Sequence, residues 1–559
     1  MRVALTATAG LALAVLLSGA VSTGGVSVRA APAGAVALGP GSTTMRSTAS
    51  TGTGPTRART AEPTRTVADF ARQRLVWEGC PAGQRELNEA GGRCAEVTVP
   101  LDYAEPGGRT IRIAVSRIKA RSPEGRSGIL LSNPGGPGGT GLAYTLALRP
   151  ALGDAADRYD LIGFDPRFLG GSTPLSCAPA ARPTPPPEVT SPRQDFERSV
   201  RSARDTARRC QVHGDNAELL PHASTRNVAR DMDLIRAVLG ERRLSFYGVS
   251  YGADLGAVYT QMFPRRTGRM VIDSGTDPAA TQYELFQRSG APAESGLDEW
   301  AAWAARHHGT YRLGRTPGQV RAAVEGLLDR AERRPVVVAG QRLDAPLLRM
   351  LLKQPVQHEE NDPVLAALVR DLVAASHGEL TAPGTELESV LRLLASPELD
   401  GAMTGGAIYM CGDGGWPAGG WPGDPGTYWR NTVHSRATQP VFGPYVNGMI
   451  APCAFWGAEP REPGTAVAND VPLLMLHARR DNNVPYEGAL ALHRRLTGSR
   501  LVTTDLRTHG VYGRATDGHR PVPCADRTVN TYFRDGTLPP TNITCAPPKQ
   551  TVPTTPSAS

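Results

Sequence analysis

The sequence predicts an α/β fold, in which a mainly parallel sheet is flanked by helices and interrupted by an inserted helical cap. Three observations predict it. Short apolar runs alternate with helical patterns on both sides of residue 250, which is typical of the strand–helix–strand units that build parallel sheets. From residue 278 to about residue 400, helical patterns follow one another without strands. Strand-like runs then resume, which favours an insertion into one sheet domain over a separate helical domain.

The stretch around residue 250 carries the main functional signal. Leu244–Val249 is an apolar and aromatic run typical of a buried strand, and residues 253–263 have a helical pattern. Between them lies Gly248-Val249-Ser250-Tyr251-Gly252, which is G-x-S-x-G in the strand–turn–helix context of a nucleophile elbow. Glycine has no Cβ, so the strand and the helix can approach closely. A chance match is the alternative in a chain with 62 glycines, but the flanking elements favour Ser250 as an exposed nucleophile.

A serine nucleophile needs a base to take its proton and a carboxylate to orient that base. In α/β-hydrolases these residues follow in the order serine, acid, histidine, and the last two come after later strands. Asp481 follows a strand predicted at residues 471–477, and His509 follows one at residues 500–506. The sequence therefore predicts an α/β-hydrolase fold with Ser250, Asp481 and His509 as catalytic residues.

Other residues stay open for the roles of base and acid. His519 lies in a polar loop and is the main alternative base, whereas His477 lies within a predicted strand. Asp273 and Asp277 follow the strand after the elbow and are alternative acids.

A glycine-rich loop follows an earlier predicted strand. It runs Asn133-Pro-Gly-Gly-Pro-Gly-Gly-Thr-Gly141, and residues 136–141 match G-x-G-x-x-G, the pattern of dinucleotide sites. Pro137 removes a backbone N–H from a loop that would have to bind pyrophosphate, so no cofactor is expected. We interpret the loop as an oxyanion loop, in which the backbone N–H groups of Gly136 and Tyr251 stabilise the developing oxyanion.

The N-terminus predicts export. Met1-Arg2, an apolar run over residues 3–17 and then small residues are typical of a signal peptide, expected at residues 1–33. Residues 34–66 are rich in Gly, Ser, Thr, Ala and Pro, which predicts a disordered linker or propeptide. No later segment has about 18 uncharged apolar residues in a row, so no stable membrane association is expected and the protein is predicted to be secreted.

The net charge and the cysteine pattern exclude further classes of function. The net charge of +8 is modest for 559 residues, and no basic run with interleaved aromatic residues is present, so no nucleic-acid partner is expected. Eight cysteines in an exported chain indicate disulfides. No cysteine or histidine spacing is typical of a zinc site, and His358-Glu359-Glu360 lacks the second histidine of H-E-x-x-H, so no metal is expected. The order of the cysteines suggests the local pairs Cys80–Cys94, Cys177–Cys210, Cys411–Cys453 and Cys524–Cys545.

These signals together give the expected domain organisation. It comprises the first part of the α/β-hydrolase core at 67–277, a mainly helical cap at 278–425, the second part of the core at 426–546 and a loose tail at 547–559.

Several of these motifs together resemble the secreted bacterial tripeptidyl aminopeptidases, which are α/β-hydrolase serine exopeptidases related to prolyl iminopeptidase. The resemblance implies peptide substrates cleaved near a free N-terminus, with tripeptides released and no metal; we expect a monomer. This sequence departs from the family at Phe168-Leu169, where the family usually has Gly followed by a small apolar residue. The resemblance rests on Asn133–Gly139, Asp165-Pro-Arg167, residues 225–240, the Ser250 elbow, Asp273, and an end block with Asp481, His509, Cys524, Gly536–Pro539 and Cys545.

An aminopeptidase must also bind a cationic α-amine, which a pocket carboxylate does through charge-assisted hydrogen bonds. Glu359 and Glu360 in the cap and Asp413 beside Cys411 are the predicted amine-binding residues, although each could be an ordinary surface charge. Two other functions remain open: a carboxylesterase or lipase with the same catalytic residues, and a binding protein without activity.

Overall fold

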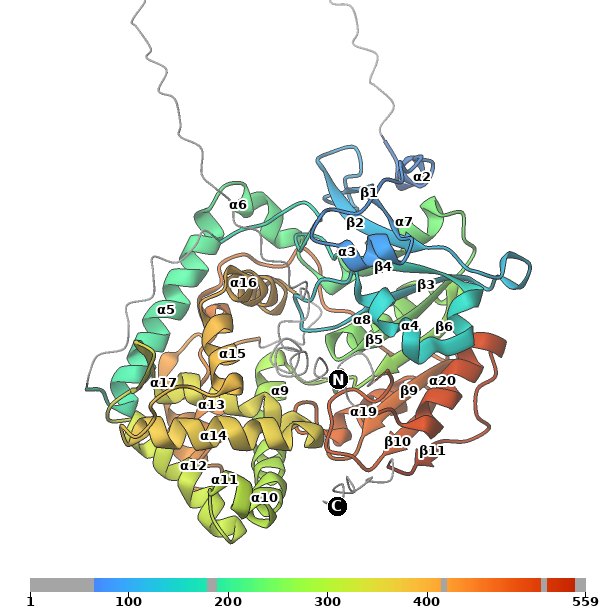
Figure 1. Cartoon of the computed structure of the whole chain (residues 1–559). Coiled ribbons are helices and arrows are strands. Elements are labelled where there is room, and N and C mark those ends of the chain that lie inside the picture. Colours follow the sequence, from blue (N-terminus) through green and yellow to red (C-terminus); the bar gives the residue numbers. More distant parts are fainter. Residues whose placement is uncertain (1–64, 178–188, 414–419, 514–519, 548–559) are drawn as a thin grey trace, which may run out of the picture.

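The computed structural model describes residues 65–177, 189–413, 420–513 and 520–547. Its centre is a nine-stranded sheet in the order β1-β2-β4-β3-β5-β6-β9-β10-β11 (Figure 1). Strands β1 and β2 pair antiparallel at one edge, and β2 is antiparallel to β4; all pairs from β4 to β11 are parallel. The strands are β1 (Arg93–Pro100), β2 (Thr110–Ile118), β3 (Gly128–Asn133), β4 (Tyr159–Phe164), β5 (Leu244–Val249), β6 (Thr267–Asp273), β9 (Leu473–Ala478), β10 (Ser499–Thr504) and β11 (Ile543–Cys545).

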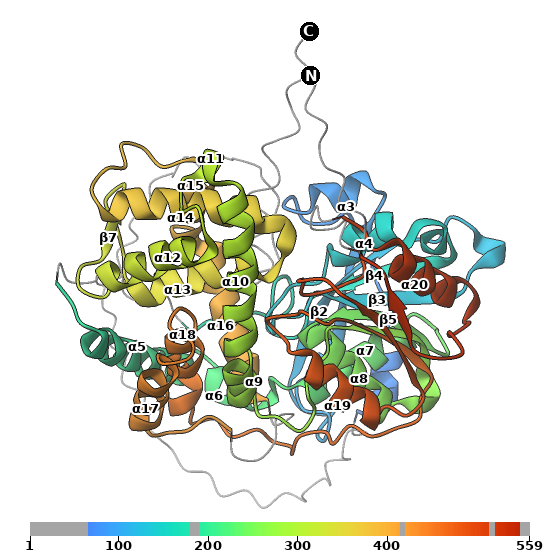
Figure 2. The same ribbon diagram turned by 90° about the horizontal axis from the view of Figure 1, so that it is seen from below.

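Helices cover both faces of this sheet, with α7, α8 and α19 on one face and α4 and α20 on the other (Figure 2). Successive residues of a strand point to opposite faces. Ile129 and Leu131 of β3 are accordingly buried under the first group of helices, and Leu130 under the second. These helices are α4 (Tyr144–Leu152), α7 (Thr225–Val238), α8 (Tyr251–Met262), α19 (Tyr486–Arg495) and α20 (Pro523–Asp535).

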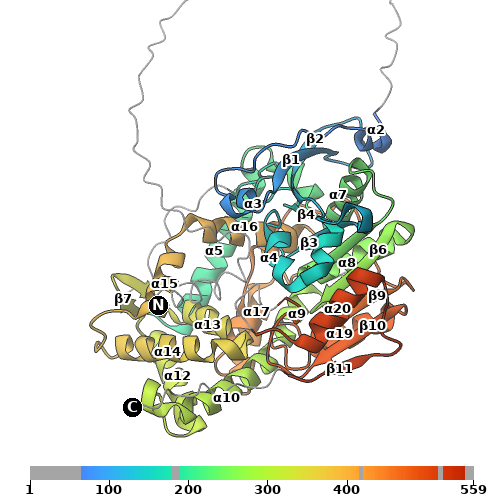
Figure 3. The ribbon, with the colours of Figure 1, turned by 45° about the vertical axis from the view of Figure 1, so that its right-hand side comes forward.

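A helical cap lies between β6 and β9 in the chain and beside the sheet domain in space (Figures 1 and 3). It has its own apolar core, in which Trp300 is fully buried and donates from Nε1 to the backbone O of Asp362 at 3.1 Å. Helix α5 comes before the elbow in sequence but packs against this region through Phe196. The members are α5 (Pro192–Val212), α9 (Gln282–Arg288), α10 (Gly290–Arg306), α11 (His308–Tyr311), α12 (Pro317–Ala331), α13 (Ala345–Lys353), α14 (Asp362–Ser376), α15 (Thr385–Leu394), α16 (Pro397–Gly412), α17 (Pro425–Ser435), α18 (Gly443–Gly448) and the hairpin β7 (Val336–Val338) and β8 (Gln341–Leu343).

The predicted fold class, a mainly parallel sheet flanked by helices with an inserted helical cap, is confirmed by this arrangement. The hairpin β7–β8 is the one part of the cap whose strands the sequence did not indicate, because its two three-residue strands are too short to show a period. Short helices complete the described chain: α2 (Val67–Ala71), α3 (Arg85–Glu89) and α6 (Asn216–Leu219).

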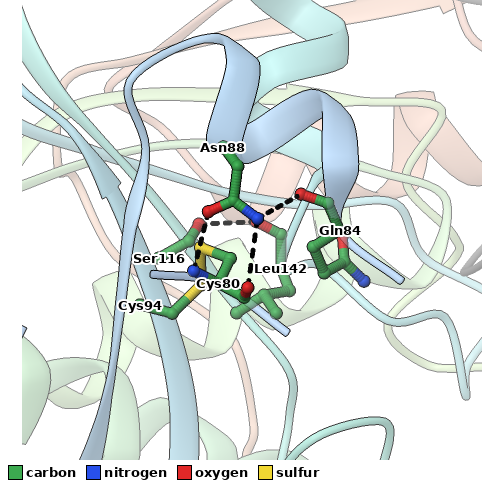
Figure 4. The surroundings of a disulfide bond; sticks show 6 residues. All are labelled: Cys80, Gln84, Asn88, Cys94, Ser116 and Leu142. Atoms are coloured by element: carbon green, nitrogen blue, oxygen red, sulfur yellow. Dashed lines mark hydrogen bonds between the residues drawn. A yellow bond between two sulfur atoms is a disulfide. The ribbon is translucent and has the colours of Figure 1, made fainter. Parts of the chain in front are cut away.

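The four predicted disulfides are all formed, and they pair the eight cysteines of the sequence. The Cys80–Cys94 bridge ties the segment before α3 to β1, where Asn88 of α3 also holds it (Figure 4). The Asn88 side chain accepts the Cys80 backbone N–H at 2.8 Å and donates to the Cys80 carbonyl at 3.0 Å. Disulfides of this kind are consistent with an extracellular protein.

The described part of the chain contains no helix with the length and apolarity needed to cross a bilayer. The predicted signal peptide at 1–33, almost all of the predicted linker at 34–66 and the tail from residue 548 lie outside the described residues.

Candidate active site

Ser250 lies at the turn between β5 and α8, as its motif predicts. Its backbone has φ 58° and ψ −127°, a conformation that costs energy for any residue with a Cβ and that clusters at functional sites. The turn closes only because its flanking residues are glycines: a Cβ on Gly248 would lie 2.1 Å from the carbonyl O of Gly252. The Ser250 N–H donates to the carbonyl O of Asp273 at 2.9 Å, which ties the turn to β6.

The glycine-rich loop after β3 packs directly on this turn. A Cβ on Gly135 would lie 2.4 Å from the carbonyl O of Val249 and 2.9 Å from the Cβ of Ser250. The next residue, Gly136, has φ +114°, and within the described chain its N–H and the N–H of Tyr251 form no hydrogen bond. Two donors left without partners beside a serine are what an oxyanion hole requires.

Asp481 and His509 are brought together from the loops that follow β9 and β10. The ring Nδ1 of His509 lies 2.8 Å from Oδ2 of Asp481. The other oxygen, Oδ1, accepts the backbone N–H groups of Asn483 and Val484, both at 2.9 Å. Because an ionised carboxylate only accepts, Nδ1 carries the proton and the Nε2 of His509 is left as an acceptor.

Asp481 and His509 shift each other's pKa through their charges. Burial would raise the pKa of Asp481, but the adjacent His509 holds this pKa below its ordinary value. Burial would likewise lower the pKa of His509, yet the charge and hydrogen bond of Asp481 raise it above the ordinary value for histidine. The pair therefore favours a charged imidazole, the species formed when a base takes a proton from serine.

The loop that carries His509 lies against the elbow. The backbone N–H of Gly510 donates to Oγ of Ser274 at 2.9 Å, and a Cβ on Gly510 would lie 3.3 Å from Cγ2 of Val249, the residue before Ser250. Ser274 itself has φ 58°, a second strained residue at this edge of the sheet. The histidine loop thus lies against both the end of β6 and the turn that bears Ser250.

The alternative residues occupy different places. His477 is fully buried in β9, with Nε2 3.0 Å from the carbonyl O of Val484. His519 lies outside the described residues. Asp277 forms an ion pair with Arg288 at 2.6 Å. Asp273, the other alternative acid, is fully buried and accepts backbone N–H groups of the histidine loop.

The predicted amine-binding residues are spread over two parts of the cap. Glu359 lies beside Arg507 and 3.6 Å from Arg480, and Glu360 is its neighbour in the same short turn. Asp413 directly follows α16, is buried, and accepts the hydroxyl of Thr225.

Helix α16 rests on the oxyanion loop, so Asp413 is placed close to the elbow. A Cβ on Gly138 would lie 2.5 Å from the backbone N of Gly406. The hydroxyl of Tyr251 lies 2.8 Å from Oγ1 of Thr225, the same hydroxyl that meets Asp413. Asp413 is therefore linked through Thr225 to the side chain of the residue after Ser250.

Two further charged groups lie near this site without any signal in the sequence that indicates them. Lys353, the last residue of α13, is buried and donates from Nζ to Oδ1 of Asn483 at 3.1 Å. Burial lowers its pKa to about 8, although the charge of Asp481 opposes the shift. The second group is Asp254 on α8. Both residues acquire these surroundings only when the cap and β6 pack against the elbow, so no sequence pattern indicates them.

The described residues contain no cluster of histidine, cysteine and acidic side chains that could hold a metal ion.

Comparisons with known proteins agree with this geometry. Residues 128–328 match the α/β hydrolase fold family and residues 439–545 match the TAP-like protein family. A tripeptidyl aminopeptidase of Streptomyces lividans is 33% identical over 502 residues, covering 86% of this chain and 88% of the relative. The chain belongs to the tripeptidyl aminopeptidase family of α/β-hydrolases. The family prediction made from the motifs is thus confirmed.

Other relatives have different names. The serine protease Hip1 of Mycobacterium tuberculosis is 28% identical over 88% of this chain and 93% of its own length. Carboxylesterase B of the same species is 30% identical over 84% of this chain and 90% of its own length. Among solved structures, an esterase of Thermogutta terrifontis is 12% identical with a TM-score of 0.32, covering 78% of this chain and 98% of that one, which is too distant to bear on function.

Proposed function

We propose that this chain is a secreted serine aminopeptidase that releases short peptides, chiefly tripeptides, from the free N-termini of peptide substrates and acts as a monomer. The observation that carries the proposal is the strained elbow at Ser250, beside the paired Asp481 and His509 on the loops that follow β9 and β10. The relatives named tripeptidyl aminopeptidase supply the substrate class. The four disulfides support an extracellular location.

The reaction follows from the roles of these groups. Ser250 Oγ attacks the carbonyl carbon of the scissile amide while His509 Nε2 takes its proton. The N–H groups of Gly136 and Tyr251 stabilise the oxyanion, each typically by about 3 kcal/mol of barrier. The imidazolium, stabilised by Asp481, protonates the leaving amine, and the acyl group remains on Ser250. A water molecule, deprotonated by His509, then hydrolyses the acyl-enzyme and frees the peptide.

A panel of chromogenic amides tests the proposal. Aminoacyl, dipeptidyl and tripeptidyl p-nitroanilides with free N-termini are compared with N-acetylated copies, using the wild type, Ser250→Ala and His509→Ala. We expect the tripeptidyl amide to have the highest kcat/KM and acetylation to abolish most of it. Both variants should lose activity by about 10⁴- to 10⁶-fold. Activity that survives in Ser250→Ala would contradict the mechanism.

A carboxylesterase is the second candidate, because the relative named carboxylesterase B covers the chain nearly as fully. The same three side chains would attack an ester, and the cap would decide the substrate. Short acyl p-nitrophenyl esters, measured beside the amides, separate the two functions. Ester hydrolysis with no cleavage of any free-amine amide would favour the esterase.

A further inference from the structure

Asp254 is a half-buried acidic residue one helical turn beyond Ser250. Its backbone N–H contacts the carbonyl O of Ser250 at 3.4 Å, so the two residues share one side of the first turn of α8. Oδ1 accepts the backbone N–H of Thr276 at 3.0 Å and its hydroxyl at 3.1 Å. Oδ2 is buried and has no hydrogen-bond partner in the described part of the chain.

Within the described residues no Arg or Lys forms an ion pair with Asp254, whereas the nearby acids Asp277 and Glu359 pair with Arg288 and Arg480. An ionised carboxylate in such a place is costly without a positive partner. Burial raises the pKa of Asp254 to about 7. Among the described residues, Asp254 Oδ2 is therefore an unpartnered acceptor with no counter-ion, one helical turn from Ser250.

A second carboxylate, Asp413 of the cap, is linked through Thr225 to Tyr251, which begins the helix that carries Asp254. The charge of Asp413 adds to the rise in the pKa of Asp254, and the charge of His509 opposes it, so Asp254 lies within electrostatic reach of both. Asp413 is fixed by Thr225 at the end of α16. The core and the cap thus each contribute one acid near the first turn of α8.

We propose that Asp254, together with Asp413, binds the α-ammonium group of the peptide substrate. This inference rests on the proposed aminopeptidase function and identifies its amine site. The ammonium donates a charge-assisted hydrogen bond to Asp254 Oδ2 and supplies a positive charge beside that carboxylate. Because Asp254 is on the nucleophile helix, the distance from this site to Ser250 limits how many residues fit between the amine and the scissile bond.

The test compares two substrates that differ only at the N-terminus. One is the p-nitroanilide of the length that the wild type cleaves best, with a free α-amine; the other is its desamino analogue, in which hydrogen replaces the ammonium. Asp254→Asn keeps the shape and the acceptor toward Thr276 but removes the charge. We expect the ratio of kcat/KM, free amine over desamino, to fall about 10- to 100-fold.

Asp277→Asn is the matched control. Asp277 directly follows Thr276, which binds Asp254, and its own charge already pairs with Arg288. Its ratio should stay within roughly twofold of the wild type, because the charge of Asp277 is already neutralised by Arg288. The enzyme concentration used for kcat/KM is that of protein that reacts with a fluorophosphonate at Ser250. Asp254→Ala replaces Asp254→Asn in the test if the Asn variant does not fold. A ratio in Asp254→Asn that stays at the wild-type value, or equal losses on both substrates, would overturn the amine site.

The same experiment separates this inference from the proposed function. If the wild type cleaves no free-amine amide, the aminopeptidase itself is refuted. If it cleaves them through Ser250 and the ratio does not shift in the Asp254 variants, the function stands and only the amine site fails.

Discussion

Asp273 holds Tyr512 by a hydrogen bond of 2.8 Å from the Tyr512 backbone N–H to its Oδ2. The same oxygen accepts the N–H of Val511 at 2.8 Å. These residues follow His509 directly, so the carboxylate at the end of β6 fixes the loop of the proposed base. Asp273 also accepts the Ser250 N–H through its backbone carbonyl. One residue therefore positions both the nucleophile turn and the histidine loop.

Replacing this carboxylate should misplace the base. In Asp273→Ala two buried N–H groups lose their acceptor, at a cost of about 1–3 kcal/mol each. We expect kcat to fall roughly 100-fold, since shifts of about 1 Å in catalytic groups have effects of that size, with a smaller change in KM. Asp273→Asn, which keeps one acceptor oxygen, should recover much of the rate. Steady-state kinetics and thermal unfolding measure both; an Ala variant with wild-type kcat would show that the loop is held by other contacts.

The pH dependence of kcat/KM should show the coupling between His509 and Asp481. His509 must be neutral to accept the serine proton, and its pKa is raised above the ordinary value by Asp481. Activity is therefore lost as the pH falls through this raised pKa and is present above it. In Asp481→Asn the raising charge is gone, so the acid limb should move to lower pH while kcat falls about 10⁴-fold. An acid limb that stays in place would indicate that another group is the base.

The oxyanion loop should tolerate no side chain at Gly135. Gly135→Ala places a methyl group 2.4 Å from the Val249 carbonyl O and 2.9 Å from the Ser250 Cβ, at φ +90°. We expect kcat to fall at least about 100-fold, as for loss of one oxyanion donor. Gly83→Ala is the control, because nothing lies within 4 Å of its added Cβ. Comparable rates in the two variants would contradict the close packing of loop and elbow.

Sequence reasoning was strongest where the signal is local. The elbow of Ser250 is specified by five consecutive residues between a strand and a helix, and the order of the cysteines sufficed to predict all four disulfides. The acid and the base could be proposed because each follows a recognisable strand.

The remaining features depend on contacts between distant segments. The orphaned oxygen of Asp254 and the buried ammonium of Lys353 arise only when β6 and the cap approach the elbow. Asp273 could be proposed as an acid, but no sequence pattern predicts its hydrogen bonds to a loop more than 200 residues later. Phe168, where the family usually has glycine, adopts φ 70°, so the family preference for glycine has a backbone reason there.

The attachment of the cap to the histidine loop leads to a last prediction, on stability. Arg507, two residues before His509, is almost fully buried and pairs with Asp362 at the start of α14. Burial raises the pKa of Asp362 to about 6, even with Arg507 beside it. Arg507→Met leaves this buried carboxylate without its cation, so we expect a loss of about 3–5 kcal/mol in the free energy of unfolding at pH 8.

The loss should be smaller at pH 5. Because the folded state binds a proton at Asp362 more tightly than the unfolded state does, stability from this group falls as the pH rises toward its folded pKa, and that pKa rises further in the variant. Denaturant unfolding at the two pH values measures the difference. The double variant Arg507→Met/Asp362→Leu, which removes the stranded charge, should recover part of the loss. If the double variant is less stable than Arg507→Met at pH 8, the stranded carboxylate is not the cause.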